Sequence, residues 1–118
     1  MTEDRNSKRY DLEERTLKFA KEIRDFAKKL SKTLSNREYI KQLIRSSGSI
    51  GANYIEANES LGKKDFVMRI KICRKESKES RYWLNLIETH NDELEKEGLI
   101  REVTELMKIF GSVIEKYK

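Results

Sequence analysis

No proline interrupts this chain of 118 residues, and it contains only one cysteine and one histidine. Without proline, no position has an obligatory helix break. A single cysteine cannot form an internal disulfide, which is typical of a protein kept in a reducing compartment. No apolar run approaches the roughly 18 residues that a membrane span needs, and the first residues, MTEDRNSKRY, lack the apolar core of a secretory signal. We therefore expect a cytoplasmic protein that does not associate with membranes.

The scarcity of cysteine and histidine also bears on catalysis. Cys73 and His90 together cannot supply the ligands of a zinc site. A di-metal site in a helix bundle needs a Glu-x-x-His motif on each of two helices, and one histidine cannot provide two. Cys73 lies among apolar positions, where a cysteine is usually a small buried hydrophobe. The sequence therefore predicts no metal site, no cofactor and no enzymatic activity.

Charged residues make up 40% of the chain and hydrophobic residues 36%, which is enough for one modest core. No useful length alternates with a period of two, so we expect no strand. Four segments show helical periodicity instead: residues 11–33, 36–61, 63–90 and 99–117. Capping boxes are indicated at Asp11 and at Ser35, each with a glutamate three residues later, and Gly62 suits a helix C-cap.

Each segment has one apolar stripe with spacings of three and four residues. The predicted stripes are Leu12, Phe19, Ile23, Phe26 and Leu30; Ile40, Leu43, Ser47, Ile50, Tyr54, Ala57 and Leu61; Phe66, Ile70, Cys73, Ser77, Ser80, Leu84 and Ile87; and Ile100, Val103, Met107, Phe110, Ile114 and Tyr117, with Leu99, Leu106 and Val113 beside the last. Short connections favour antiparallel neighbours. The predicted fold is therefore all-α: one antiparallel up-down four-helix bundle over residues 1–118.

The stretch SSGSIGANYIEANESLG, residues 46–62, is rich in glycine and serine and raises the alternative of a phosphate-binding loop. A Walker loop needs a lysine after its last glycine and a strand before its first, and both are missing here. A GXXG loop of the KH type is matched by GSIG, but that fold needs a sheet. The apolar period runs through the stretch, so we predict a helix in which Gly48 and Gly51 permit close packing, within the subunit or against another copy.

The third segment presents two further surfaces beside its core stripe. Residues 62–87 hold eight basic and three acidic side chains, whereas residues 88–118 have an acidic excess. One surface gathers cations, which suit sequence-independent binding to phosphates or a solvated helix face. These candidate nucleic-acid ligands are Lys64, Lys71, Arg74, Lys75, Lys78 and Arg81. The other flank combines Glu76, Glu79 and Trp83, which suits a contact between protomers, with Arg45 or Arg69 as partners; Trp83 could equally widen the core stripe.

Two motifs together resemble a known family. The first is Ser49, Ile50, Ala52, Asn53 and Glu56 in the second helix. The second is Lys75, Glu76, Glu79, Tyr82, Trp83 and Leu84 in the third. The pair resembles the four-helix bundle family named for the 23S rRNA intervening sequence, over roughly residues 10–117. Many relatives have proline where this chain has Gly51.

The resemblance implies a homo-oligomeric ring, commonly a pentamer, without an established catalytic activity. It also implies kinship with the accessory variability protein of diversity-generating retroelements, which associates with a reverse transcriptase and nucleic acid. We therefore expect an oligomeric accessory protein that binds RNA or DNA through its basic surface and assists a nucleic-acid enzyme. The alternative is a structural or protein-binding ring that makes no direct contact with nucleic acid.

Overall fold

The computed structural model describes the backbone of residues 2–118 and the side chains of residues 11–118. It consists of four helices: α1 (Thr2–Lys29), α2 (Leu34–Asn58), α3 (Lys63–Leu86) and α4 (Glu93–Lys116). Residues 2–118 contain no strand. The all-α prediction is confirmed, and so is the helical reading of residues 46–58, which lie within α2.

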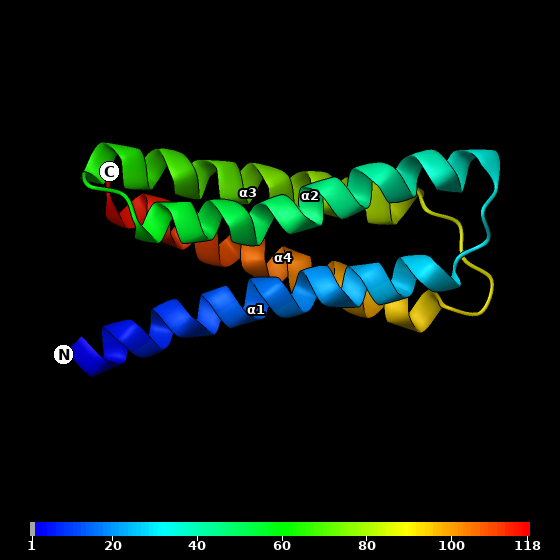
Figure 1. Cartoon of the computed structure of the whole chain (residues 1–118), viewed down its shortest axis with the longest axis horizontal. Helices are drawn as coiled ribbons and strands as arrows, with labels where there is room; N and C mark the ends of the chain where they lie inside the picture. The colour runs from blue at the N-terminus through cyan, green and yellow to red at the C-terminus, as the bar shows by residue number, and fades with distance from the viewer. Residues whose placement is uncertain (1) are drawn as a thin grey trace.

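Each helix packs against the next along the chain, and α1 also contacts α4, which closes a four-helix bundle. The connections between successive helices lie at alternating ends of the molecule, as Figure 1 shows. The rod that results measures 47 × 24 × 20 Å. The start of α3 and the end of α4 therefore lie at the same end of the rod (Figure 1).

The core is built from the predicted stripes. Phe19, Ile23 and Phe26 of α1 are fully buried, as are Leu43 and Ile50 of α2. Each such side chain contributes roughly 1.5–3 kcal/mol through its removal from water. The stripes were least accurate where apolar residues are neighbours in the sequence or where a helix ends.

The structure differs from the predicted stripes along α4 and beyond the ends of α2 and α4. In α4 the buried positions are Leu99, Val103, Leu106, Phe110 and Ile114. Leu99 and Leu106 are thus buried in place of Ile100 and Met107, the residues that follow them in the sequence. Ile100 and Met107 are half-buried. Leu61 is fully exposed and Tyr117 is 40% exposed, because each lies beyond the last residue of its helix.

The predicted helix ends were wrong at three places. Asp11 does not cap a helix, because α1 extends through it from Thr2. The N-cap of α2 is Thr33, whose hydroxyl oxygen accepts a hydrogen bond from the backbone amide of Asn36, and it replaces the predicted Ser35. Gly62 is the N-cap of α3 and not the C-cap of α2.

The third and fourth helices also meet differently from the prediction. Helix α3 ends at Leu86 instead of near His90, and α4 begins at Glu93 instead of Leu99. Asn36, which is 1% exposed, holds the connection between them in place. Its side-chain amide donates to the carbonyl oxygens of Ser31 and Glu88 at 3.0 Å each, and its Oδ1 accepts from the backbone amide of Glu88 at 3.1 Å. The α1–α2 loop is therefore fastened to the segment that follows α3.

Ion pairs join α1 to α4, which make the smallest of the four helix–helix contacts. The Arg15 guanidinium donates to both carboxylate oxygens of Glu102, at 2.8 and 2.9 Å. This hydrogen bond raises the pKa of Arg15. Lys29 pairs with Glu95 further along the same contact. Two carboxylates of α4 are thus neutralised by cations of α1.

Candidate nucleic-acid interface

The orientation of α3 follows from its buried positions. Ile70, Cys73, Ser77, Ser80 and Leu84 are each fully buried and face the rest of the bundle. Their side chains fix the rotation of the helix, so the residues about half a turn away must face solvent. That outward side is where the predicted cations lie.

The structure brings all six predicted cations to the outward part of α3. Lys64, Lys71, Lys75 and Lys78 are exposed, and Arg74 and Arg81 are half-buried. We call these six residues the basic surface. Among the side chains of residues 11–118, no carboxylate lies within ion-pair distance of any of them. Arg81 makes one neutral contact, a hydrogen bond of 3.4 Å from its guanidinium to the hydroxyl of Thr104.

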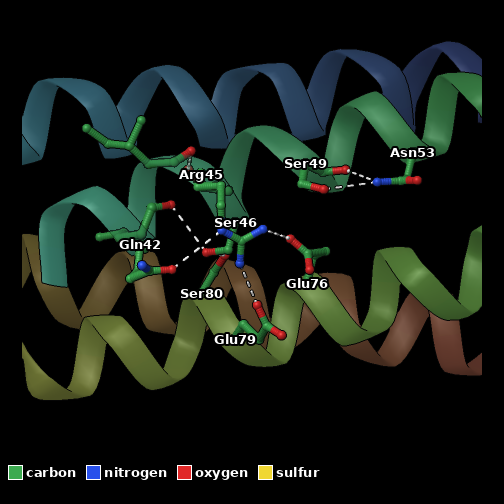
Figure 2. A network of polar contacts seen from close by, with 11 residues as sticks. Gln42, Arg45, Ser46, Ser49, Asn53, Glu76, Glu79 and Ser80 are labelled. Atoms are coloured by element: carbon green, nitrogen blue, oxygen red, sulfur yellow. Dashed lines mark hydrogen bonds and ion pairs between the residues drawn. The ribbon is translucent and has the colours of Figure 1, made fainter. Parts of the chain in front are cut away.

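The two carboxylates of α3 on the other flank are paired within the same chain. Figure 2 shows Arg45 extending from α2 between Glu76 and Glu79. Its guanidinium lies 3.2 Å from a Glu76 oxygen and 2.8 Å from a Glu79 oxygen. The predicted pairing with Arg45 is thus present, but it joins two helices of one protomer. A role of Glu76 and Glu79 in a contact between protomers stays a prediction.

A buried polar contact lies beneath this ion-pair cluster. The hydroxyls of Ser46 and Ser80 are 2.8 Å apart, and both residues are fully buried (Figure 2). Serine side chains occupy little space, so α2 and α3 can approach closely here, and the hydrogen bond satisfies both hydroxyls. The sequence placed Ser80 in the core stripe but did not reveal Ser46 as its partner.

The family motif of α2 forms a second link to α3. The Asn53 amide donates to the carbonyl and the hydroxyl oxygens of Ser49, at 2.9 and 3.0 Å (Figure 2). Its Oδ1 accepts a hydrogen bond of 3.0 Å from Arg69 of α3. Arg69, the other predicted cation partner, is therefore engaged by an amide and not by Glu76 or Glu79. Asn53 of the motif thus has a structural function between α2 and α3.

The two glycines of α2 lie in different surroundings. A Cβ at Gly51 would lie 2.9 Å from the Thr16 hydroxyl oxygen of α1, closer than real Cβ contacts come. A Cβ at Gly48 would meet no atom within 4 Å. Gly51 therefore serves the packing of α1 on α2, whereas Gly48 lies on an open surface. An interface role for either glycine stays a prediction.

Trp83 lies at the end of α3 among aromatic rings. Its ring stacks on Tyr39 of α2, with centroids 6.1 Å apart, and contacts Tyr82 edge-on at 5.2 Å. Its indole Nε1 is buried and is the single such side-chain atom without a hydrogen-bond partner among residues 11–118. The indole therefore packs on the core cluster as a half-buried ring, and its buried donor has no acceptor among the described residues.

The environment of Cys73 opposes thiolate chemistry. Desolvation by burial raises the pKa of its thiol from 9.0 to about 12. The thiol donates a weak hydrogen bond to the Ile50 carbonyl oxygen at 3.5 Å.

Residues 11–118 contain no group of three or more histidine, cysteine or acidic side chains placed to hold a metal ion. No helix within that part of the chain is long and apolar enough to cross a bilayer.

Sequence comparison and structure comparison point to one family. Residues 8–112 match the family model described as 23S rRNA-intervening sequence protein. The fold is similar to a protein of unknown function from the S23 ribosomal protein family of Bacteroides thetaiotaomicron VPI-5482, with a TM-score of 0.81 and 32% sequence identity. That alignment covers 92% of this chain and 98% of the other. No curated protein matches the chain. The chain belongs to the family of 23S rRNA-intervening sequence proteins.

Proposed function

We propose that this chain is a non-enzymatic accessory protein that binds nucleic acid, RNA or an RNA/DNA hybrid, through the basic surface. The supporting observation is the absence of carboxylate partners for all six cations among the described side chains. Unpaired cations that share one face are available to replace the counterions of a phosphate backbone. The family's name, which refers to 23S rRNA, favours RNA.

The size of the basic surface sets the expected strength of binding. Lys64 and Arg81 are 17 residues apart in sequence, which corresponds to about 26 Å along the helix at 1.5 Å per residue. Six cations over that length could neutralise several phosphates of one strand. If each of the six cations neutralises one phosphate, the logarithm of the binding constant should fall linearly with the logarithm of salt concentration. The slope should be about −5 for a duplex, at about 0.9 per phosphate, and about −4 for a single strand, at about 0.7 per phosphate.

The proposal includes self-assembly and a protein partner. A homo-oligomeric ring would present several copies of the basic surface, and simultaneous contacts would raise the affinity well above that of one copy. The proposed contact with a second copy lies near Trp83, whose side chain is only half-buried within one chain. The partner that we propose is a nucleic-acid enzyme such as a reverse transcriptase, acting in the cytoplasm, where the free Cys73 thiol would stay reduced. Burial and the raised pKa of that thiol support a role in which Cys73 is not a nucleophile.

The test compares two sets of charge-neutralising substitutions. The first set is Lys71→Gln, Lys75→Gln and Lys78→Gln on the basic surface. The control set is Lys18→Gln, Lys21→Gln and Lys28→Gln, which are exposed on α1 and change the net charge by the same amount. Binding of structured RNA should weaken strongly and its salt slope should become shallower in the first set only, because phosphate contacts are lost only there.

Two outcomes would contradict the proposal. Equal loss in both sets would mean that net charge, and not this surface, attracts RNA. No binding of wild-type protein at low salt, with capture of an acidic protein instead, would favour a structural or protein-binding ring. Light scattering on the same samples measures the assembly, and a monomeric mass would remove the ring from the proposal.

A further inference from the structure

The row of cations on α3 is bounded by an exposed aromatic ring at each end. Tyr82 lies four residues beyond Lys78 on the same side of the helix and is 59% exposed. At the start of α3, Tyr117, the C-cap of α4, is 40% exposed beside Lys64 and Lys71. Both rings are held by other aromatics, because Tyr82 contacts Trp83 edge-on and Tyr117 packs on Phe66 at 5.3 Å.

A hollow of about 530 Å³ lies at the Tyr117 end of the row. Helix α3 begins and α4 ends at this end of the rod (Figure 1). Its lining residues are Lys63, Lys64, Val67, Met68, Lys71 and Tyr117. This volume lies within the roughly 300–1,000 Å³ range of small-ligand pockets. The ammonium of Lys63 lies 5.7 Å from the centre of the Tyr117 ring, and Met68 is 55% exposed. The hollow thus combines an aromatic ring and aliphatic side chains with three cations.

We propose that the basic surface takes a single-stranded nucleic acid, with one unstacked base in the hollow beside Tyr117 and another against Tyr82. This inference rests on the proposed function and names its substrate. Lys64 and Lys71 belong both to the hollow and to the cation row, so one strand can place a base on the ring and its adjoining phosphates on the lysines. A duplex keeps its bases stacked in its interior and cannot offer a base face to either ring.

The arrangement favours a nucleic acid over an acidic protein. A protein interface of useful strength has an apolar core within a polar rim. Between Met68 and Tyr82, the outward residues of the row are Lys71, Lys75 and Lys78, and α3 has no other large apolar side chain that is exposed. Cations that follow a backbone, with aromatic rings on which bases stack, are the usual features of single-strand binding.

The experiment measures fluorescence anisotropy with two labelled RNA probes. One probe is a single strand of about 12 nucleotides, which lies within the roughly 4–16 nucleotides that one OB-fold domain binds. The other probe is the same strand in a duplex with its complement. The variants are Tyr82→Leu and Tyr117→Leu, each compared with the phenylalanine substitution, which retains a stacking face. Leu94→Ala, at an 83% exposed position away from the row, is the control for loss of surface apolar area.

We expect each leucine variant to bind the single strand at least fivefold more weakly, which is the lower limit of the 1–3 kcal/mol measured for base–aromatic stacking. Duplex binding should not change, and the phenylalanine variants should bind both probes as the wild type does. Circular dichroism melting checks that each variant is folded. A 2-aminopurine in the strand should lose fluorescence on wild-type protein and lose less on the Tyr117→Leu variant.

The remaining outcomes separate this inference from the proposed function. If both leucine variants bind the single strand as the wild type does, while Lys71→Gln weakens both probes, the inference is overturned and the proposed function stands. If wild-type protein prefers the duplex, the inference is overturned in the same way. If neither probe binds at low salt but polyglutamate does, both proposals are overturned.

Discussion

Gly48 and Gly51, three residues apart on α2, should respond in opposite directions to the same small substitution. Each glycine costs the helix about 1 kcal/mol relative to alanine when its surroundings are open. Gly48 meets this condition, because an added Cβ finds no atom within 4 Å. Gly48→Ala should therefore raise the free energy of unfolding by about 1 kcal/mol, which corresponds to about 4 °C in Tm for a chain of this size.

At Gly51 the added methyl group meets α1. It would lie 2.9 Å from the Thr16 hydroxyl oxygen and 3.3 Å from the Thr16 Cβ. Thr16 is 1% exposed, and its hydroxyl donates to the Leu12 carbonyl oxygen at 2.8 Å, so the branched side chain cannot easily move away. Overpacking of this kind costs about 1–3 kcal/mol. After the helix-propensity gain is subtracted, Gly51→Ala should lower stability by about 0–2 kcal/mol.

Urea denaturation followed by far-UV circular dichroism measures both variants. It should be run at several protein concentrations, because assembly would add to the apparent stability. The double variant Thr16→Ala with Gly51→Ala should recover part of the loss, since the nearest atom is removed and neighbouring sites couple. If Gly51→Ala stabilises the protein as much as Gly48→Ala does, the described contact between α1 and α2 is wrong. If Gly48→Ala instead destabilises in a concentration-dependent manner, another copy packs on Gly48, as the sequence-based interface hypothesis requires.

Three further predictions concern polar groups inside the bundle. The Cys73 thiol has a pKa of about 12 in the folded chain and 9.0 in the unfolded chain. Between these two values only the unfolded chain loses the thiol proton, so the free energy of unfolding should fall by up to about 1.4 kcal/mol per pH unit above pH 9. Urea titrations in reducing buffer at increasing pH measure this slope, and Cys73→Ala should remove it; an unchanged slope in that variant would assign it to another group. Ser46→Ala should cost about 1–3 kcal/mol by leaving the buried Ser80 hydroxyl unpaired, whereas Ser80→Ala should cost less, because the Ser46 hydroxyl can still donate to the Leu43 carbonyl oxygen. The double variant should lose less than the sum of the two, and strict additivity would mean that the hydroxyls do not interact. Arg45→Met should cost about 1–3 kcal/mol, because it leaves the Glu76 carboxylate, whose side chain is 7% exposed, without its cation. Adding Glu76→Gln should restore part of that stability in the same denaturation assay, and a further loss would contradict a charge-based cause.

The core was predictable where one apolar residue occupies each helical turn. Phe19, Ile23 and Phe26 have no large apolar residue directly beside them in the sequence, so the period of 3.6 residues identifies their face directly. In α4 the apolar residues come as adjacent pairs, and Leu106 and Met107 satisfy the period equally well. Packing against α3 and α1 then decides between them, and it buries Leu106. Helical periodicity alone leaves that rotation of about 100° open.

Helix ends were less predictable because several residues can perform the same capping function. Thr33 and Ser35 are both good N-caps, and local preference does not separate them. The structure selects Thr33, and the buried Asn36 is then placed to join the connection before α2 to Glu88 after α3. That contact spans 52 residues of sequence, so no local signal could have revealed it. Asn36 is for this reason the most important structural residue that sequence reasoning missed.

The basic surface shows most clearly what the folded chain adds to a count of charges. In the sequence, Glu76 and Glu79 lie among the cations of residues 62–87 and reduce their net charge. In the bundle these two carboxylates face α2, where Arg45 engages both. Glu102 and Glu95 of α4 are likewise engaged by α1, on the side away from the basic surface. These four carboxylates, which lower the net charge of the sequence, thus form their ion pairs with Arg45, Arg15 and Lys29 and not with the basic surface. The outward side of α3 is therefore more strongly positive than the composition of its segment indicates, and this difference is the physical basis of the proposed phosphate binding.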